Sequence, residues 1–218
     1  MNRDLVCAFD SSTPLASVAV FSIAKNELVA NVERVMDRAH GEGLLPLVDE
    51  VLTSLGLGPR DVGRWAVGVG PGSFTGTRIG VATAKGIVLA TGAELVGVSA
   101  FDALCLDVAP DAKRRERVVA LLDAQKGELY VRVDGEAPFY QAAGLVAGTL
   151  ERRIALPETA LLVGAASADV ELAGARRLVD RPHDVPRASA VARLAARAPA
   201  GRAETVEPDY VRPADVTR

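Results

Sequence analysis

One pattern occurs twice in this chain: a short apolar strand that ends in an aspartate, a polar turn, and a second strand. In the first copy, five apolar residues precede Asp10, and residues 15–21 form the next strand. In the second copy, an apolar strand ends at Asp123, and residues 129–133 follow its turn. Strands of this kind, joined by short polar turns, favour antiparallel pairs. The repeat therefore predicts two lobes that begin in the same way.

The correspondence between the two copies can be stated residue by residue. Superimposing the two aspartates places Val131 on Val18 and Val133 on Val20. An internal match of this kind indicates a structural repeat. An aspartate before a turn is also common in unrelated proteins, so coincidence is the competing explanation.

The remaining apolar patterns predict an α/β chain. An amphipathic helix is expected at 44–55, because apolar residues recur there at helical spacing with acidic and hydroxyl residues opposite. The other expected elements are strands at 5–9, 15–21 and 28–35, a strand at 65–69, a helix at 75–92, strands at 95–98, 117–123 and 129–133, a strand and turn at 161–166, an Ala-rich helix at 188–198 and an extended tail at 208–213.

Residues 70–80 form a glycine-rich segment between the strand at 65–69 and the helix that follows. The Gly-Pro-Gly at its start can continue neither a strand nor a helix, so the chain must turn there. Ser73 or Thr75 can cap the helix by accepting a hydrogen bond from a backbone N–H of its first turn. Backbone N–H groups at a helix start suit an anion, so the segment is a candidate phosphate site.

Small residues recur at every fourth position in the same helix, at Gly76, Gly80 and Ala84. An interior glycine costs about 0.5–1 kcal/mol relative to alanine, so this spacing calls for a reason. The close approach of another backbone is one, either inside the same domain or from a helix of a partner. A glycine loop at a helix start is a weak fingerprint for a ligand, so packing and ligand binding both stay open.

Composition bounds the class of protein. The 218 residues are 49% apolar and 24% charged, which is ordinary for a globular protein with a sizeable core. The net charge is −3, so we expect RNA to be held mainly by another protein. The start of the chain is too polar for a signal peptide, and no segment reaches the roughly 18 apolar residues of a membrane span. Cys7 and Cys105 lack partners at metal-ligand spacing, so they are expected to be reduced, in a cytoplasmic protein without a zinc site.

Two lobes that each open with this turn resemble the actin-like ATPase superfamily. Five sequence blocks make the resemblance more specific, and together they resemble the TsaB family. The blocks are AFDSST at 8–13, HGEGLLPLV at 40–48, GPGSFTG at 70–76 with RIG at 78–80 and AKG at 84–86, DAQKGELY at 123–130, and PDYVR at 208–212. Thr77 stands where the family pattern has leucine, a departure that concerns helix packing more than chemistry.

The resemblance implies two RNase H-like or actin-like lobes, each a mixed sheet with flanking helices. Their expected bounds are 1–105 for the first lobe and 106–205 for the second. The tail at 206–218 is expected to pack back on the first lobe.

The resemblance also implies a function. TsaB is the non-catalytic companion of TsaD in bacterial formation of N6-threonylcarbamoyladenosine at position 37 of tRNAs that read codons beginning with A. The implied partners are TsaD in a heterodimer and the ATPase TsaE in a larger complex, with a homodimer when the chain is alone. The tRNA is then an indirect partner, and no membrane is involved.

TsaD itself carries a His-x-x-x-His pair that binds a metal, and the resemblance places those two positions on Ala100 and Leu104. Neither side chain can bind a metal. The chain has only two histidines, His40 and His183, so no pair of that spacing exists. Asp102 is expected to cap a helix or lie on the surface. We therefore expect no catalytic and no metal-binding residue, and for His40 a capping or interface role.

The partner surface is expected on the helix at 44–55 and on the small-residue stripe of the helix at 75–92. Its residues are His40, Leu44, Leu45, Val48, Val51, Leu52, Gly76, Arg78, Gly80 and Ala84. The charge run at 113–117 is expected to be a solvated linker, with a partner or RNA contact as the minor alternative.

The alternative function is a weak nucleotide-binding ATPase or kinase of the actin-like class, and less plausibly a peptidase. Its cofactor would be ATP or ADP with Mg²⁺, opposite Asp123 of the second lobe. The candidate nucleotide-binding residues are Asp10, Ser11, Ser12, Thr13, Gly72 and Ser73. For a peptidase, the sequence shows neither metal ligands nor a Ser/His/Asp grouping.

Overall fold

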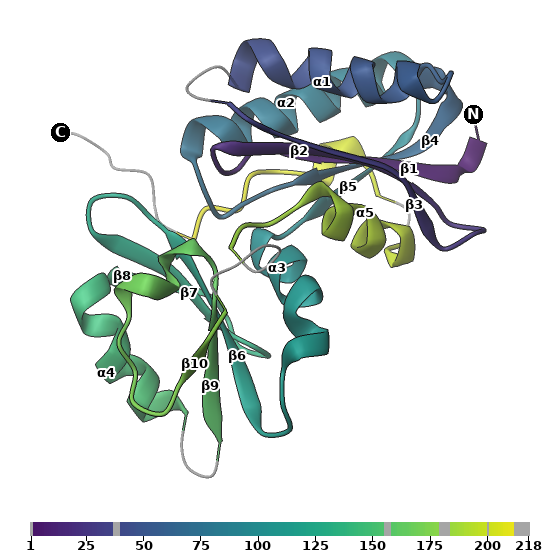
Figure 1. Ribbon diagram of the computed structural model, residues 1–218. Coiled ribbons are helices and arrows are strands. Elements are labelled where there is room, and N and C mark those ends of the chain that lie inside the picture. Colours follow the sequence, from purple (N-terminus) through teal and green to yellow (C-terminus); the bar gives the residue numbers. More distant parts are fainter. Residues whose placement is uncertain (1, 37–39, 155–157, 179–183, 200, 212–218) are drawn as a thin grey trace, which may run out of the picture. The chain divides into compact units, whose positions relative to one another are not determined.

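A computed structural model describes residues 2–36, 40–154, 158–178, 184–199 and 201–211. The chain forms two compact units, which are drawn in Figure 1. The first comprises residues 1–103 and 186–209, and the second comprises residues 104–185 and the segment from Tyr210. The boundary between them falls within helix α3 (Ala100–Val108).

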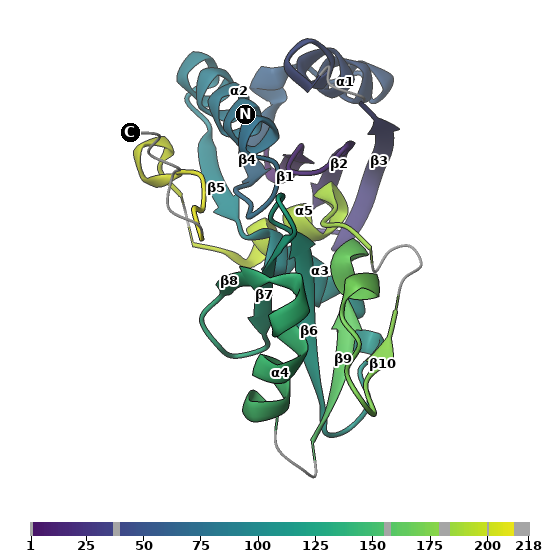
Figure 2. The same ribbon diagram turned by 90° about the vertical axis from the view of Figure 1, so that its left-hand side faces the viewer.

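The first unit is a five-stranded mixed sheet with helices on both faces. Its strands lie in the order β3-β2-β1-β4-β5, with β1 antiparallel to β2 and parallel to β4. Helices α1 and α2 cover one face and α5 covers the other (Figures 1 and 2). The elements are β1 (Asn2–Asp10), β2 (Leu15–Ser22), β3 (Glu27–Val35), α1 (His40–Ser54), η1 (Pro59–Asp61), β4 (Val62–Gly68), α2 (Phe74–Thr91), β5 (Glu94–Val98), α5 (Ala188–Arg197) and η4 (Ala203–Thr205).

The core of this unit lies between the sheet and helices α1 and α2. Strand β2 is buried along its whole length, as expected for a central strand covered on both faces. Trp65 on β4 packs edge-on against Phe9 on β1, with ring centroids 6.4 Å apart. Leu44 and Leu52, on the apolar side of α1, are each 1% exposed and complete this core.

The second unit repeats the strand order of the first. Its sheet runs β10-β9-β6-β7-β8, with β6 antiparallel to β7 and parallel to β9. The elements are η2 (Ala109–Asp111), β6 (Glu116–Asp123), β7 (Glu128–Val133), β8 (Phe139–Ala142), α4 (Ala143–Arg153), β9 (Thr159–Val163), η3 (Ala165–Asp169) and β10 (Arg176–Arg177). The fold is thus the expected pair of mixed sheets with flanking helices.

The predicted residue correspondence between the two copies is wrong by one position beyond the turn. Val18 pairs with the residue before Asp10, and in the second unit Tyr130 holds that place. The residue equivalent to Val18 is therefore Tyr130 and not Val131, because the second turn is one residue shorter. The two aspartates themselves do correspond.

The division of the chain also differs from the expected bounds. Helix α5 packs against β1 and β2, so residues 186–209 belong to the first unit and not to the second. Beyond this helix the chain stays with the first sheet, where Val206 joins the core and the N–H of Asp209 donates to the carbonyl of Val69, 2.8 Å away. Helices α3 and α4 and strand β8 are elements that the sequence patterns did not indicate. No helix among the described residues is long and apolar enough to span a bilayer.

Candidate functional site

The turn after β1 is closed by its own aspartate. Asp10 Oδ1 accepts hydrogen bonds from the backbone N–H and from the hydroxyl of Ser12, both at 2.8 Å. Asp10, Ser11 and Ser12 are all buried. Thr13, the next residue, donates from its hydroxyl to the carbonyl of Leu15 over 3.2 Å. The aspartate therefore has a structural part in holding the turn.

The glycine-rich segment lies directly against this turn. The N–H of Ser73 donates to the carbonyl of Ser12 over 2.6 Å, and the Ser11 hydroxyl donates to the carbonyl of Gly76 over 2.9 Å. A Cβ atom on Gly72 or Gly76 would lie less than 3.0 Å from the carbonyl oxygen of Ser12 or Ser11, respectively. We call this arrangement the turn clasp: residues 10–13 held by residues 72–80.

The turn clasp explains the glycines of α2 within one unit. On Gly80, a Cβ atom would lie 2.8 Å from the Ser11 hydroxyl oxygen, and Ala84 one turn further is fully buried. Gly86, in contrast, has nothing within 4 Å of its Cβ position. Gly76 and Gly80 thus make room for the β1–β2 turn. Of the two explanations for the small-residue spacing, this is packing within the same domain and not contact with a partner helix.

All six predicted nucleotide residues come together in the turn clasp, where the hydroxyls of Ser11, Ser12 and Thr13 already donate to protein oxygen atoms. Ser73 caps α2, because its hydroxyl accepts from the N–H of Gly76 at 3.2 Å. In the second unit, Asp123 accepts from the backbone and side-chain N–H groups of Gln125, at 2.7 and 2.9 Å. Nucleotide binding at these turns stays a prediction.

Most of the predicted partner residues face the interior of the first unit. Those buried are Leu44, Val48, Val51, Leu52, Gly76, Gly80 and Ala84. The apolar stripe of α1 and the small residues of α2 pack inside the unit, and a partner role for these residues stays a prediction. Leu45 (54% exposed) and Arg78 do lie at the surface. His40 begins α1, and its side chain lies outside the described residues.

A different set of residues forms the outer face of α1 and α2. Phe74 is half exposed, and the Arg78 guanidinium lies over its ring with Cζ 3.6 Å from the centroid. Leu89, on the same helix, is 89% exposed. Elsewhere on this side of the unit, a pocket of about 500 Å³ is lined by Leu45, Pro46, Val48, Asp49, Leu52, Pro59 and Ile87. We call Leu45, Pro46, Pro59, Phe74 and Leu89 the outer face.

The sequence patterns missed most of the outer face. Phe74 and Leu89 are apolar residues of α2 that lie outside the stripe formed by Gly76 and Gly80. An apolar residue off the buried stripe of an amphipathic helix is the signal that could have found them.

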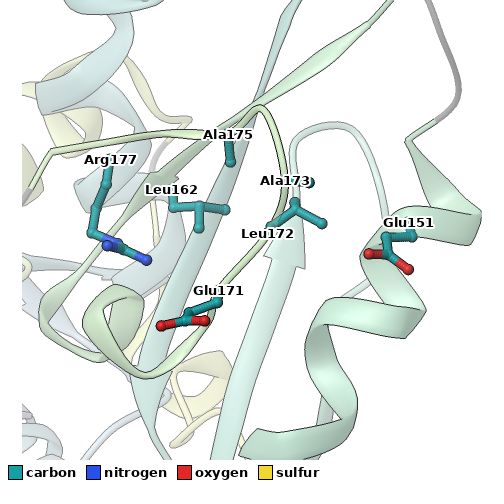
Figure 3. Close-up of a pocket in the computed structure, with 7 residues that line it drawn as sticks. All are labelled: Glu151, Leu162, Glu171, Leu172, Ala173, Ala175 and Arg177. Carbon is teal, nitrogen blue, oxygen red and sulfur yellow. The ribbon is translucent and has the colours of Figure 1, made fainter.

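A second pocket lies in the second unit and holds none of the predicted site residues. It measures about 510 Å³ and is lined by Glu151, Leu162, Glu171, Leu172, Ala173, Ala175 and Arg177. Figure 3 shows Glu151 projecting from α4 on one side and Arg177 on the other. The Arg177 guanidinium donates to the carbonyl of Val170 over 2.6 Å, which fixes it at the pocket wall.

Comparison with known proteins decides the family. The family model described as TsaD, tRNA N6-adenosine threonylcarbamoyltransferase, matches residues 27–170, more than half of the chain. This chain belongs to the TsaD family. Within it, the chain is 34% identical over 130 residues to the tRNA threonylcarbamoyladenosine biosynthesis protein TsaB of Haemophilus influenzae, covering 60% of this chain and 53% of that protein. It is 36% identical over 129 residues to TsaB of Escherichia coli, covering 57% and 52%.

The chain thus spans about half the length of the curated relatives it matches. The structural similarity extends further. YeaZ from Pseudomonas aeruginosa is 26% identical and superimposes with a TM-score of 0.73, over 96% of this chain and all of that one. The expected resemblance to TsaB proteins is therefore confirmed.

The two positions that the resemblance aligns with the metal ligands of TsaD lie on α3. Ala100 and Leu104 are one helical turn apart and fully buried. Asp102 lies between them, in the first turn of the helix, and is exposed. Among the described residues of this TsaD-family chain, no group of three His, Cys, Asp or Glu side chains could hold a metal ion.

Proposed function

We propose that this chain is a non-catalytic subunit that binds and activates TsaD in the formation of N6-threonylcarbamoyladenosine at position 37 of tRNAs that read codons starting with A. The observation that carries the proposal is the outer face, which exposes apolar side chains although the unit beneath it already has a complete core. Single exposed leucines are common, but a pocket lined by Leu45, Pro46, Pro59 and Ile87 is an apolar patch of the kind that marks an interface. The names of the TsaB relatives support the pathway.

The proposal includes the partners that the resemblance implies. TsaD would bind the outer face, and a second copy of this chain would occupy the same face when TsaD is absent, since one self-complementary patch can serve both. TsaE would join the larger complex as the ATPase. The adenosine that reacts would be held by TsaD, in the cytoplasm, where tRNA is modified.

The experiment compares two substitutions of exposed leucines. Leu45→Glu places a charge in the outer face, and Leu145→Glu, on α4, changes a leucine that is 62% exposed in the second unit. We expect both variants to fold, because neither side chain is buried. Only Leu45→Glu should lose the complex with TsaD, measured as the mass in solution of the mixed proteins. Equal complex formation by the two variants would exclude the outer face as the interface.

Nucleotide binding is the second candidate, and one observation favours it: the fold brings Asp10, Ser12 and Ser73 together as the actin-like resemblance requires. Calorimetry with ATP and Mg²⁺ tests it, with Asp10→Asn as the variant. Micromolar binding followed by turnover in the isolated chain would contradict a non-catalytic role.

A further inference from the structure

A tight turn before β6 presents three consecutive cations. The N–H of Glu116 donates to the carbonyl of Lys113 over 3.0 Å and closes a turn with Arg114 and Arg115 at its centre. Lys113, Arg114 and Arg115 are exposed, and their side chains make no hydrogen bond or ion pair with any residue that the structure describes. We call these three residues the basic turn.

The basic turn holds an arginine where the backbone favours glycine. Arg115 has a φ of 72°, in the left-handed region. The third residue of a turn with this conformation is most often glycine or asparagine, since a Cβ atom is strained there. Strained backbone of this kind concentrates at functional sites. This chain therefore has an exposed arginine, whose side chain contacts no described residue by a hydrogen bond or ion pair, at a position that disfavours it.

The acidic residues nearest to the basic turn are occupied by other arginines. Glu116 accepts from Nε and Nη2 of Arg176, at 3.0 and 2.7 Å. This pairing lowers the pKa of Glu116 to about 2, so the carboxylate is fully charged at neutral pH but already compensated. At the next residue of β6, the Arg117 guanidinium nitrogens lie 3.3 Å from a carboxylate oxygen of Glu136 and 3.3 Å from one of Glu158. Glu116 also accepts from the backbone N–H of Lys113 and interacts electrostatically with that residue. Arg114 and Arg115 are therefore the cations of the basic turn with no acidic partner among the described residues.

A further cation lies at the same end of the second sheet. Strand β9 begins beside the basic turn, because the N–H of Thr159 donates to the carbonyl of Arg115 over 3.1 Å. Helix α4 ends just before β9, and both views place its last turn at this end (Figures 1 and 2). There Arg153 pairs with Glu136 at 2.9 Å, whereas the exposed Arg152 donates, among the described residues, to the hydroxyl of Thr149.

We propose that the basic turn, with Arg152, contacts the phosphate backbone of the tRNA. This inference rests on the proposed function, and it revises the expectation that tRNA is only an indirect partner. That expectation came from the net charge of −3, which describes the whole chain and not this end of the second unit. Exposed arginines and lysines bind phosphates without reading sequence. The contact would therefore position the tRNA while TsaD holds the adenosine.

The test measures the affinity of the complex of this chain with TsaD for an unmodified tRNA transcript that reads a codon starting with A, over a series of salt concentrations. Arg114→Ala/Arg115→Ala removes two cations from the basic turn. The matched control, Arg60→Ala/Arg197→Ala, removes two exposed cations from the first unit that likewise make no ion pair with the described residues.

Each lost phosphate contact should reduce the slope of log affinity against log salt by about 0.7–0.9. We expect the basic-turn variant to lose about 1.5 of the slope and about tenfold in affinity near 0.1 M salt, and the control to change little. Arg115→Gly should weaken tRNA binding and raise the urea midpoint of unfolding, because it relieves the strained φ. Arg115→Lys should retain most of the affinity.

Three outcomes would overturn the inference: an unchanged slope in the basic-turn variant, an equal loss in the control, or a loss of TsaD binding by the basic-turn variant, which would indicate a protein contact instead. The complex with TsaD is measured first for each variant. If the unchanged chain forms no such complex, the proposed function fails. If the complex forms and the tRNA slope is unchanged, only this inference fails.

Discussion

The turn clasp predicts opposite effects for two glycines of the same helix. Gly76→Ala adds a methyl group less than 3.0 Å from the backbone carbonyl of Ser11, where no flexible side chain can yield. Gly86→Ala adds the same group where nothing lies within 4 Å. Both substitutions improve helix propensity, so the pair separates the close contact from the intrinsic preference of the residue.

The change in the free energy of unfolding of Gly76→Ala can be estimated from the contacts that the added methyl group disrupts. Relieving the overlap shifts α2 away from the turn, and the 2.9 Å hydrogen bond from Ser11 to the carbonyl of Gly76 is lost or weakened. A buried donor left unsatisfied costs about 1–3 kcal/mol, and forced repacking costs about as much again. The gain in propensity, about 0.5–1 kcal/mol, offsets part of this. We expect Gly76→Ala to lower the free energy of unfolding by about 2–4 kcal/mol, and Gly86→Ala to raise it by up to about 1 kcal/mol.

Urea unfolding followed by circular dichroism measures both changes. If Gly76→Ala were as stable as the unchanged chain but failed to bind TsaD, the glycines would serve an external helix contact and the turn clasp would not be their reason. A loss of stability in Gly86→Ala equal to that in Gly76→Ala would also refute the argument, because it would show that the effect is not local.

Three further predictions concern stability. Glu116 has its pKa lowered to about 2, so its pairing stabilises the fold above the usual pKa near 4.3 and is lost as the pH falls toward 2. Glu116→Gln should therefore flatten acid unfolding between about pH 4.5 and 2, with a loss near 1 kcal/mol at pH 7 because the partner is partly solvent-screened; an unchanged acid profile would count against the pairing. Ser73→Ala should cost about 1 kcal/mol in urea unfolding through the lost cap of α2, and no cost would mean that the cap is not needed. Arg187→Ala removes the partner of Glu33, which is only 18% exposed, and should cost about 2–4 kcal/mol, whereas a neutral result would show that water replaces the arginine.

The sequence allowed the first strands of both units to be predicted because their signals are local. An apolar run, an aspartate that closes the next turn on itself, and a second run occur within about twenty residues each time. Such a signal needs no knowledge of the rest of the chain. The one-residue error at Val131 arose because the length of a polar turn leaves no trace in the hydrophobic pattern.

The elements that were missed or misplaced depend on distant contacts. Helix α5 follows the second unit in sequence but packs on β1 and β2. Its alanine-rich face does not indicate which of the two sheets it covers. Helix α4 includes Gly144 and Gly148, which weaken its helical signal.

The candidate site shows the same limit. Spacing correctly indicated that Gly76 approaches another backbone closely, but only the fold shows that this backbone is the β1–β2 turn and that Gly80 contacts the Ser11 side chain instead. The sequence pattern of α1 predicts which face of the helix is buried, but it does not show whether that face packs on its own sheet or on a partner. The apolar stripe was therefore predicted as a partner surface. Leu45 and Phe74, which lie off the buried stripes, form the surface that remains.

The central claim is that this chain assists TsaD without carrying out the transfer, and nucleoside analysis of the product tests it most directly. Threonylcarbamoyladenosine in the tRNA is measured in the reconstituted reaction with TsaD alone, with this chain alone, and with both. We predict no product from this chain alone, and a clear gain over TsaD alone when this chain is added, a gain that Leu45→Glu abolishes and Leu145→Glu retains. Product formed by this chain without TsaD, or an equal yield with and without this chain, would contradict the claim.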